Sequence, residues 1–115
     1  HVVSPRIDRF YATELKKLAD NGIPIIIVTN DRLKLPKEYQ KYYDDLKSSD
    51  QIKIINKPNV NYLLLFNTDQ AIFSGGTLDK EELDKSILIV TMIKEHSKIK
   101  KVAEIFSLML PSFMR

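Results

Sequence analysis

The fold expected for this chain is decided by the stretch VNYLLLFN (60–67) and, after a short turn, AIFSGGTL (71–78). Each run is rich in apolar, β-branched or aromatic residues, which favour buried strands. The intervening Asn67-Thr68-Asp69-Gln70 supplies residues that are typical of a turn. The stretch therefore predicts a β-hairpin, with strands over 61–67 and 71–74.

Helical and extended patterns alternate on both sides of this hairpin. Before it, the sequence predicts a helix over 5–21 that opens at Ser4-Pro5, a buried parallel strand over 23–29, a helix over 36–46 and a strand over 51–57. After it, we expect a charged turn over 79–84, a strand over 86–92 and a helix over 94–110. This order predicts an α/β fold, a mixed β-sheet with helices packed on its faces.

Length and composition limit the class of protein. The chain has 115 residues, 18 Lys and Arg against 15 Asp and Glu, a net charge of +3 and no cysteine, which excludes disulfides and thiolate chemistry. No apolar run approaches the roughly 20 residues of a membrane span, so we expect a soluble, cytoplasmic protein without a membrane partner. Residues 1–115 are expected to form one domain of a longer chain. No nucleotide-binding or metal-binding spacing occurs, so we expect neither a cofactor nor a metal.

The hairpin resembles the core of the phospholipase D superfamily, whose signature is H-x-K-x4-D-x6-G-S-x-N. In a gapless alignment, the matching positions of this chain for His, Lys, Asp, Gly-Ser and Asn are Val60, Tyr62, Asn67, Ser74-Gly75 and Thr77. The helix and the buried strand that precede the hairpin resemble the same family. The resemblance implies a phospholipase D-like half domain over most of the chain.

The resemblance also bears on catalysis. In that family the His is the nucleophile and the Lys neutralises phosphate oxygens, whereas Val60 cannot attack phosphorus and Tyr62 carries no cation. We therefore expect a degenerate domain with no catalytic residues, which is not an enzyme. His96 is expected to face solvent among charged residues.

Among degenerate relatives, the chain is similar to the effector domains that follow a DNA-binding domain in archaeal transcriptional regulators of the TrmB type. This similarity implies a non-catalytic domain for ligand sensing or dimerisation in a transcription-regulating protein, which contacts DNA only through a missing domain. The alternative is a supporting half domain of a phosphodiesterase or nucleic-acid-processing enzyme whose active residues lie elsewhere.

A candidate ligand site follows the buried strand over 23–29. Open α/β sheets bind ligands at the carboxyl ends of their strands, where this strand ends in a polar cluster. We expect this cluster, residues after the hairpin and a tyrosine of the second helix to bind a small sugar-like or anionic ligand. The predicted ligand-binding residues are Thr29, Asn30, Asp31, Arg32, Ser74 and Thr77.

The last helix carries two further features. Its apolar residues form a broader surface than one helix stripe requires, so Phe106, Met109 and Leu110 are candidates for a homodimer contact, or else cover the domain's own sheet. Four lysines lie between Lys94 and Lys101 with only Glu95 to oppose them. This segment is either a solvated helix face or a contact for nucleic acid.

Overall fold

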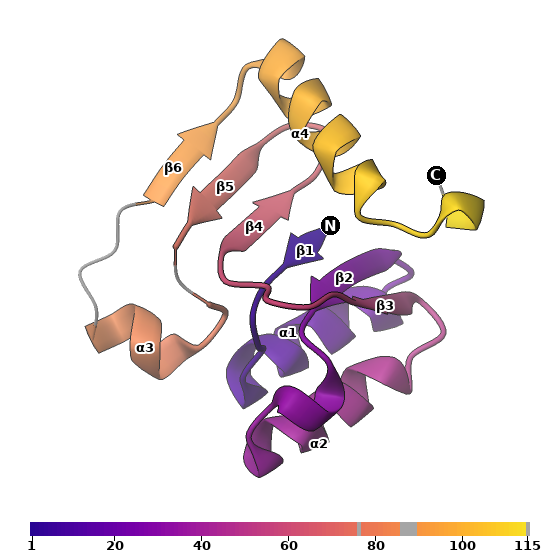
Figure 1. The fold of residues 1–115 in the computed structure, drawn as a ribbon, viewed down its shortest axis with the longest axis vertical. Helices are drawn as coiled ribbons and strands as arrows, with labels where there is room; N and C mark the ends of the chain where they lie inside the picture. The colour runs from indigo at the N-terminus through magenta and orange to yellow at the C-terminus, as the bar shows by residue number, and fades with distance from the viewer. Residues whose placement is uncertain (76, 86–89, 115) are drawn as a thin grey trace.

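The computed structural model describes residues 1–75, 77–85 and 90–114. The strands are β1 (Val2–Val3), β2 (Ile25–Thr29), β3 (Ile52–Asn56), β4 (Leu63–Phe66), β5 (Ala71–Ser74) and β6 (Val90–Ile93). The α-helices are α1 (Arg9–Asp20), α2 (Lys37–Lys47), α3 (Lys80–Lys85) and α4 (His96–Leu108), with 3-10 turns η1 (Arg32–Lys34) and η2 (Ser112–Met114). The described strands form one six-stranded sheet in the order β3-β2-β1-β4-β5-β6 (Figure 1).

The predicted fold class is confirmed. Strand β2 lies inside the sheet and runs parallel to both β1 and β3, as its continuous apolar sequence indicates. The predicted hairpin is present as β4 and β5, which pair antiparallel with Leu64 opposite Phe73. Helices cover both faces, because α4 lies on one side of the sheet and α1 and α2 lie on the other (Figure 1).

The start of the chain differs from the prediction. Val2 and Val3 form a strand between β2 and β4, and the first helix begins only at Arg9. The side chain of Asp8 caps that helix by accepting a hydrogen bond from the Tyr11 N–H at 2.9 Å. The Ser4-Pro5 pair imitates a helix start, but Ser4 is buried at the end of β1. A strand of two residues is too short to show any periodicity.

The segment after the hairpin also differs. Residues predicted as a charged turn form the helix α3, in which the Leu83 N–H donates to the Asp79 carbonyl at 2.9 Å. Its composition of Lys, Glu and Leu favours a helix. The next predicted strand is seen as β6, which begins at Val90, and residues 86–89 of that prediction lie outside the described residues.

Each face of the sheet buries its own apolar cluster. Successive strand residues point to opposite faces, so Val2 packs with the cluster under α1 and α2, whereas Val3 packs with the cluster under α4. In the part of the chain that the structure describes, no helix has the length and hydropathy needed to cross a membrane.

Candidate functional site

Four chain segments meet at one edge of the sheet, which we call the carboxyl edge. The parallel strands β1 and β2 both end there. Strand β4 runs antiparallel to β1 and therefore begins there, and β5 runs antiparallel to β4 and ends there. This topology gathers Ser4 to Arg6, Thr29 and Asn30, Val60, and Thr77 to Asp79.

Two buried hydroxyls fasten the ends of β1 and β5 together. The Oγ of Ser4 lies 3.0 Å from Oγ1 of Thr77 and accepts a hydrogen bond from the Leu78 N–H at 3.1 Å. Thr77 Oγ1 donates to the Arg6 carbonyl at 2.7 Å and accepts from the Arg6 N–H at 3.2 Å. The position that matches the family's Asn therefore carries a hydroxyl that binds backbone, and both hydroxyl groups are buried.

Asn30 connects three segments of the same edge. Its Nδ2 donates to the carbonyls of Pro5 and Val60, both at 3.1 Å, and its Oδ1 accepts from the Val60 N–H at 2.9 Å. The hydroxyl of Thr29 also donates to the Pro5 carbonyl at 3.1 Å. Val60 itself is buried in the cluster under α4. The amide of Asn30 therefore fixes the backbone at the position that matches the family's nucleophile.

A charged cluster of Arg6, Tyr39 and Asp79 completes the edge. The Tyr39 hydroxyl donates to Asp79 Oδ2, and the Arg6 Nε lies 3.6 Å from that same oxygen. The Arg6 guanidinium carbon lies 5.1 Å from the centroid of the Tyr39 ring. Asp79 is only 5% exposed, whereas the Arg6 side chain is 34% exposed. A buried carboxylate and an aromatic ring thus hold a cation that solvent can reach.

The chemistry of this cluster follows from its protonation. The hydrogen bond to Asp79, followed by burial, raises the pKa of Tyr39, so its hydroxyl stays a neutral donor at physiological pH. A guanidinium presents paired N–H donors that match the oxygens of phosphate. The edge can therefore bind and orient a phosphate group.

Sequence reasoning missed Arg6 and Asp79. The sequence predicts Arg6 within a helix and Asp79 in a charged turn, and only the fold brings the two residues together across a separation of 73 positions. Of the tyrosines of the second helix, Tyr39 lies at this edge, and its contact with a ligand stays a prediction. The neighbouring Tyr43 is buried and donates to Asn56 Oδ1 at 3.1 Å.

The structure brings together only some of the predicted ligand-binding residues. Thr29, Asn30 and Thr77 meet at the carboxyl edge through the backbone of Pro5 and Arg6. Ser74 is buried at the end of β5, opposite Leu63. Ligand binding by these residues stays a prediction.

The two charged residues of that prediction have local partners. Asp31 caps η1 by accepting from the Leu33 N–H at 3.1 Å. Arg32 forms a two-pronged exposed pair with Asp44, with nitrogen to oxygen distances of 2.7 and 2.8 Å. This hydrogen bond is the main cause that holds the pKa of Asp44 below its ordinary value.

The candidate dimer residues lie on or next to α4. Phe106 is 2% exposed and packs against Phe66, with 5.1 Å between ring centroids, and Leu110 is also buried. Met109 is half-buried, and its sulfur accepts a hydrogen bond from the Tyr62 hydroxyl at 3.5 Å. Phe106 and Leu110 therefore belong to the domain's own core, and a homodimer contact through this helix stays a prediction.

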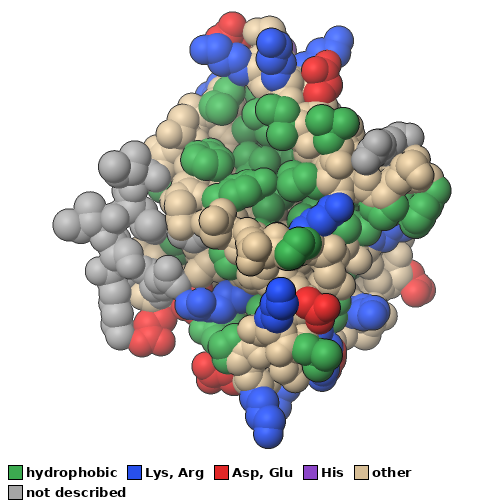
Figure 2. Space-filling model, in the orientation of Figure 1, with side chains coloured by type: hydrophobic (Ala, Val, Ile, Leu, Met, Phe, Trp, Pro, Cys, Tyr) green, Lys and Arg blue, Asp and Glu red, His purple; other side chains and the backbone are tan. Residues whose placement is uncertain are grey.

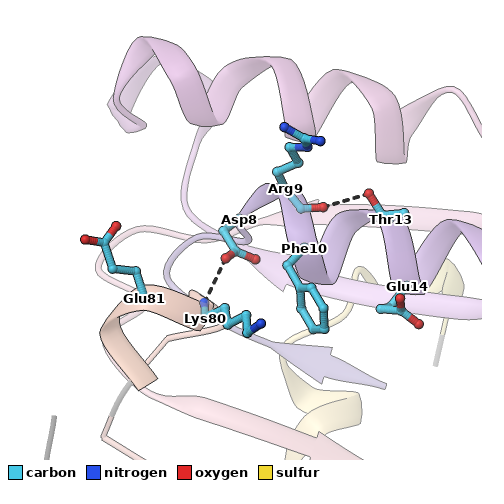
Figure 3. A pocket seen from close by; sticks show the side chains of 7 residues that line it. All are labelled: Asp8, Arg9, Phe10, Thr13, Glu14, Lys80 and Glu81. Carbon is cyan, nitrogen blue, oxygen red and sulfur yellow. Dashed lines mark hydrogen bonds between the residues drawn. The ribbon is translucent and has the colours of Figure 1, made fainter. Parts of the chain in front are cut away.

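A wide hollow of about 670 Å³ lies between the starts of α1 and α3. Figure 3 shows Asp8 accepting from the Lys80 N–H, which the structure places at 2.8 Å, and Arg9 and Phe10 pointing to opposite sides of the helix start. The Lys80 ammonium lies 4.9 Å from the Phe10 ring centroid. Acidic and basic side chains are mixed around this hollow, so it favours no ligand of a single charge.

Metal binding and histidine chemistry gain no support from the described residues. No group of three or more His, Cys, Asp or Glu side chains within residues 1–75, 77–85 and 90–114 is placed to hold a metal ion. His96 is exposed at the first position of α4, as the sequence predicts.

Comparisons with known proteins identify the fold. No known protein family matches the chain, and no curated protein matches it. Among solved structures, the chain is similar to NucT from Helicobacter pylori, with a TM-score of 0.76 and 14% sequence identity over 94% of this chain and 76% of that chain. NucT is a nuclease of the phospholipase D superfamily. The chain therefore has a phospholipase D-like fold of a mixed sheet and packed helices.

One prediction is corrected by this neighbour. From Val60 and Tyr62 we expected that the protein is not an enzyme, but a nuclease shares its fold, so the comparison points toward an enzymatic relative. The error lies in the step from two side chains to the whole protein, because residues that act on a substrate need not all come from one half domain. A similarity to TrmB-type regulators is not shown.

Proposed function

We propose that this chain is a half domain of a nucleic-acid-processing phosphodiesterase. In this proposal, the carboxyl edge binds a backbone phosphate. A nucleophile from a second half domain forms a bond to its phosphorus while the bond from phosphorus to one sugar oxygen breaks, and that oxygen leaves with its electron pair and takes up a proton. Arg6 contacts the phosphate oxygens, and Tyr39 and Asp79 hold the guanidinium in place.

The observation that carries the proposal is the placement of Arg6. It lies on the edge that also carries the family-matched positions Val60 and Thr77, and it pairs there with the buried Asp79. Val60 offers no nucleophile. The phospholipase D-like fold shared with a nuclease makes nucleic acid the phosphodiester to test first.

Binding of a fluorescent single-stranded oligonucleotide, measured by anisotropy over a range of salt concentrations, tests this function. Arg6→Gln should weaken binding about threefold to tenfold, because one phosphate contact is lost. The slope of the logarithm of the binding constant against the logarithm of the salt concentration should become shallower by about one. Arg6→Lys should retain part of the affinity. Arg9 is an exposed residue of α1, three positions further along the chain. Arg9→Gln removes the same charge outside the carboxyl edge and should change oligonucleotide binding little.

Two results would contradict the proposal. Equal losses for Arg6→Gln and Arg9→Gln would show that only net charge matters. Cleavage of the oligonucleotide by this chain alone, unaffected by Arg6→Gln, would place a nucleophile on the chain at another site. Melting temperatures of all variants control for unfolding.

A second candidate is ligand sensing or dimerisation in a transcription-regulating protein. The observation that favours it is that Thr29, Asn30 and Thr77 meet at the edge where open α/β sheets bind ligands. Chemical-shift mapping with such ligands distinguishes the two functions. A ligand that shifts the edge residues, without any affinity for the oligonucleotide, would favour sensing.

A further inference from the structure

An apolar groove lies on the sheet face that carries α4. Its sheet wall includes Tyr62 and Phe73 of the hairpin and Ile93 of β6, and its helix wall consists of Val102, Ile105 and Met109. The groove has a volume of about 220 Å³. Figure 2 shows hydrophobic side chains gathered on this face of the molecule. None of the residues assigned to phosphate binding above lies in it.

Several groove side chains remain open to solvent. Phe73 is 44% exposed and Ile105 is 62% exposed, although both are large and apolar. Exposed apolar surface in one continuous area commonly marks a site where another molecule docks. The hydroxyl of Tyr62 donates to the Met109 sulfur at 3.5 Å, so the groove's own hydroxyl is engaged within it.

One end of the groove is basic. Lys98 and Lys101 lie four residues before Val102 and Ile105 on α4, so they continue the helix wall by one turn. Lys94 directly follows the groove residue Ile93. Figure 2 shows basic side chains, with acidic ones among them, at this end of the face.

The ion pair that these lysines make with an acidic residue is weak. Lys98 Nζ lies 3.5 Å from Glu95 Oε2, but both side chains are largely exposed. Such surface pairs contribute little and leave the lysine accessible. The end of the groove therefore keeps a net positive charge.

We propose that this groove binds an amphipathic segment of a partner protein, with apolar side chains in the groove and acidic side chains beside the lysines. The positive charge of Lys94, Lys98 and Lys101 favours acidic side chains at one end of the partner segment. Five of the seven lining residues are aliphatic or carry a thioether, and only Tyr62 and Phe73 carry rings, so the groove favours apolar protein side chains over a run of stacked bases. Helices dock in such grooves through apolar residues spaced along one face.

The probe is a fluorescent amphipathic peptide with leucines along one helical face and glutamates at one end, titrated with the 115-residue chain. Its matched probe carries lysines in place of the glutamates. The acidic peptide should bind at least about tenfold more tightly than the basic one. Ile105→Asp should weaken binding of the acidic peptide about tenfold or more, because apolar anchors dominate such interfaces.

Matched variants separate docking from general effects. Leu33→Asp places the same charge at a residue that is 80% exposed on η1, and it should leave binding unchanged. Lys101→Glu should weaken peptide binding in low salt. Lys41→Glu, at an exposed residue of α2, should not weaken it. Circular dichroism should show the same fold for all variants, because every changed side chain is exposed.

Several results would overturn this proposal. These are an absence of peptide binding, equal effects of Ile105→Asp and Leu33→Asp, or displacement of the peptide by oligodeoxythymidine. A dimer of the chain in sedimentation that Ile105→Asp dissociates would assign the groove to a second copy instead. The proposal is independent of phosphate binding, because Arg6→Gln should leave peptide affinity unchanged.

Discussion

Replacement of Asn30 by Ala tests how the carboxyl edge is held together. The side chain makes two hydrogen bonds as donor, to Pro5 and Val60, and one as acceptor, from Val60. A typical hydrogen bond contributes about 1 kcal/mol net to stability. The full sum is about 3 kcal/mol, and partial exposure of Asn30 lets water replace some of it. We therefore expect a loss of about 2 kcal/mol.

Urea denaturation followed by circular dichroism measures this loss. The midpoint should fall by about 1 M, because domains of this size lose roughly 1–3 kcal/mol of stability per molar urea. Asn61→Ala removes an amide from an exposed residue just before β4 and should change the midpoint little. A loss below about 0.5 kcal/mol for Asn30→Ala, equal to that of Asn61→Ala, would refute the bridging role.

Asn30→Asp is a second test of the role of the Asn30 side chain. The introduced carboxylate faces two carbonyl oxygens in place of the amide donors. Its pKa in the folded state should be raised, because the charged form is disfavoured there. A carboxyl with a raised folded pKa destabilises the fold increasingly as pH rises through its ordinary value. Asn30→Asp should therefore approach the wild type at low pH and fall below it at neutral pH.

Three further outcomes are expected. Phe106→Asp should abolish the fold in circular dichroism, because an unpaired charge would enter the core, whereas a folded monomer formed from a wild-type dimer in sedimentation would identify an interface. Arg32→Ala should return the pKa of Asp44 toward its ordinary value in an NMR titration. The stability that this pair contributes is present above that value and is lost as pH falls through the lowered pKa. Ultraviolet titration should show Tyr39 ionising above its ordinary pKa, and Asp79→Asn should remove that shift.

The elements that could be predicted are those with long, regular patterns. The apolar run that became β2 and the hairpin of β4 and β5 each bury several consecutive residues, so their sequences alone indicate strands. The two-residue strand β1 gives no such signal and is formed by pairing with β2 and β4. Tertiary contacts rather than local preference decide its conformation.

The sequence predicts where the candidate site lies, but it does not predict all of the residues that form the site. Thr29 and Asn30 mark the end of a buried strand, and open sheets bind ligands at that end. Arg6 and Asp79 meet only because β1 and the segment after β5 end at the same edge. No local pattern near either residue indicates the other.

The position of β1 has a consequence for folding kinetics. Among the described strands, β1 joins β2 and β3 to β4, β5 and β6, and it pairs with β2 25 residues away but with β4 61 to 63 residues away. Closing the long loop from β1 to β4 costs chain entropy before its contacts repay it. We infer that the pairing of β1 with β4 forms late and that it couples the two halves of the sheet cooperatively. Pulsed hydrogen exchange during refolding that shows the β1–β4 pairing protected before the β4–β5 hairpin would contradict this order.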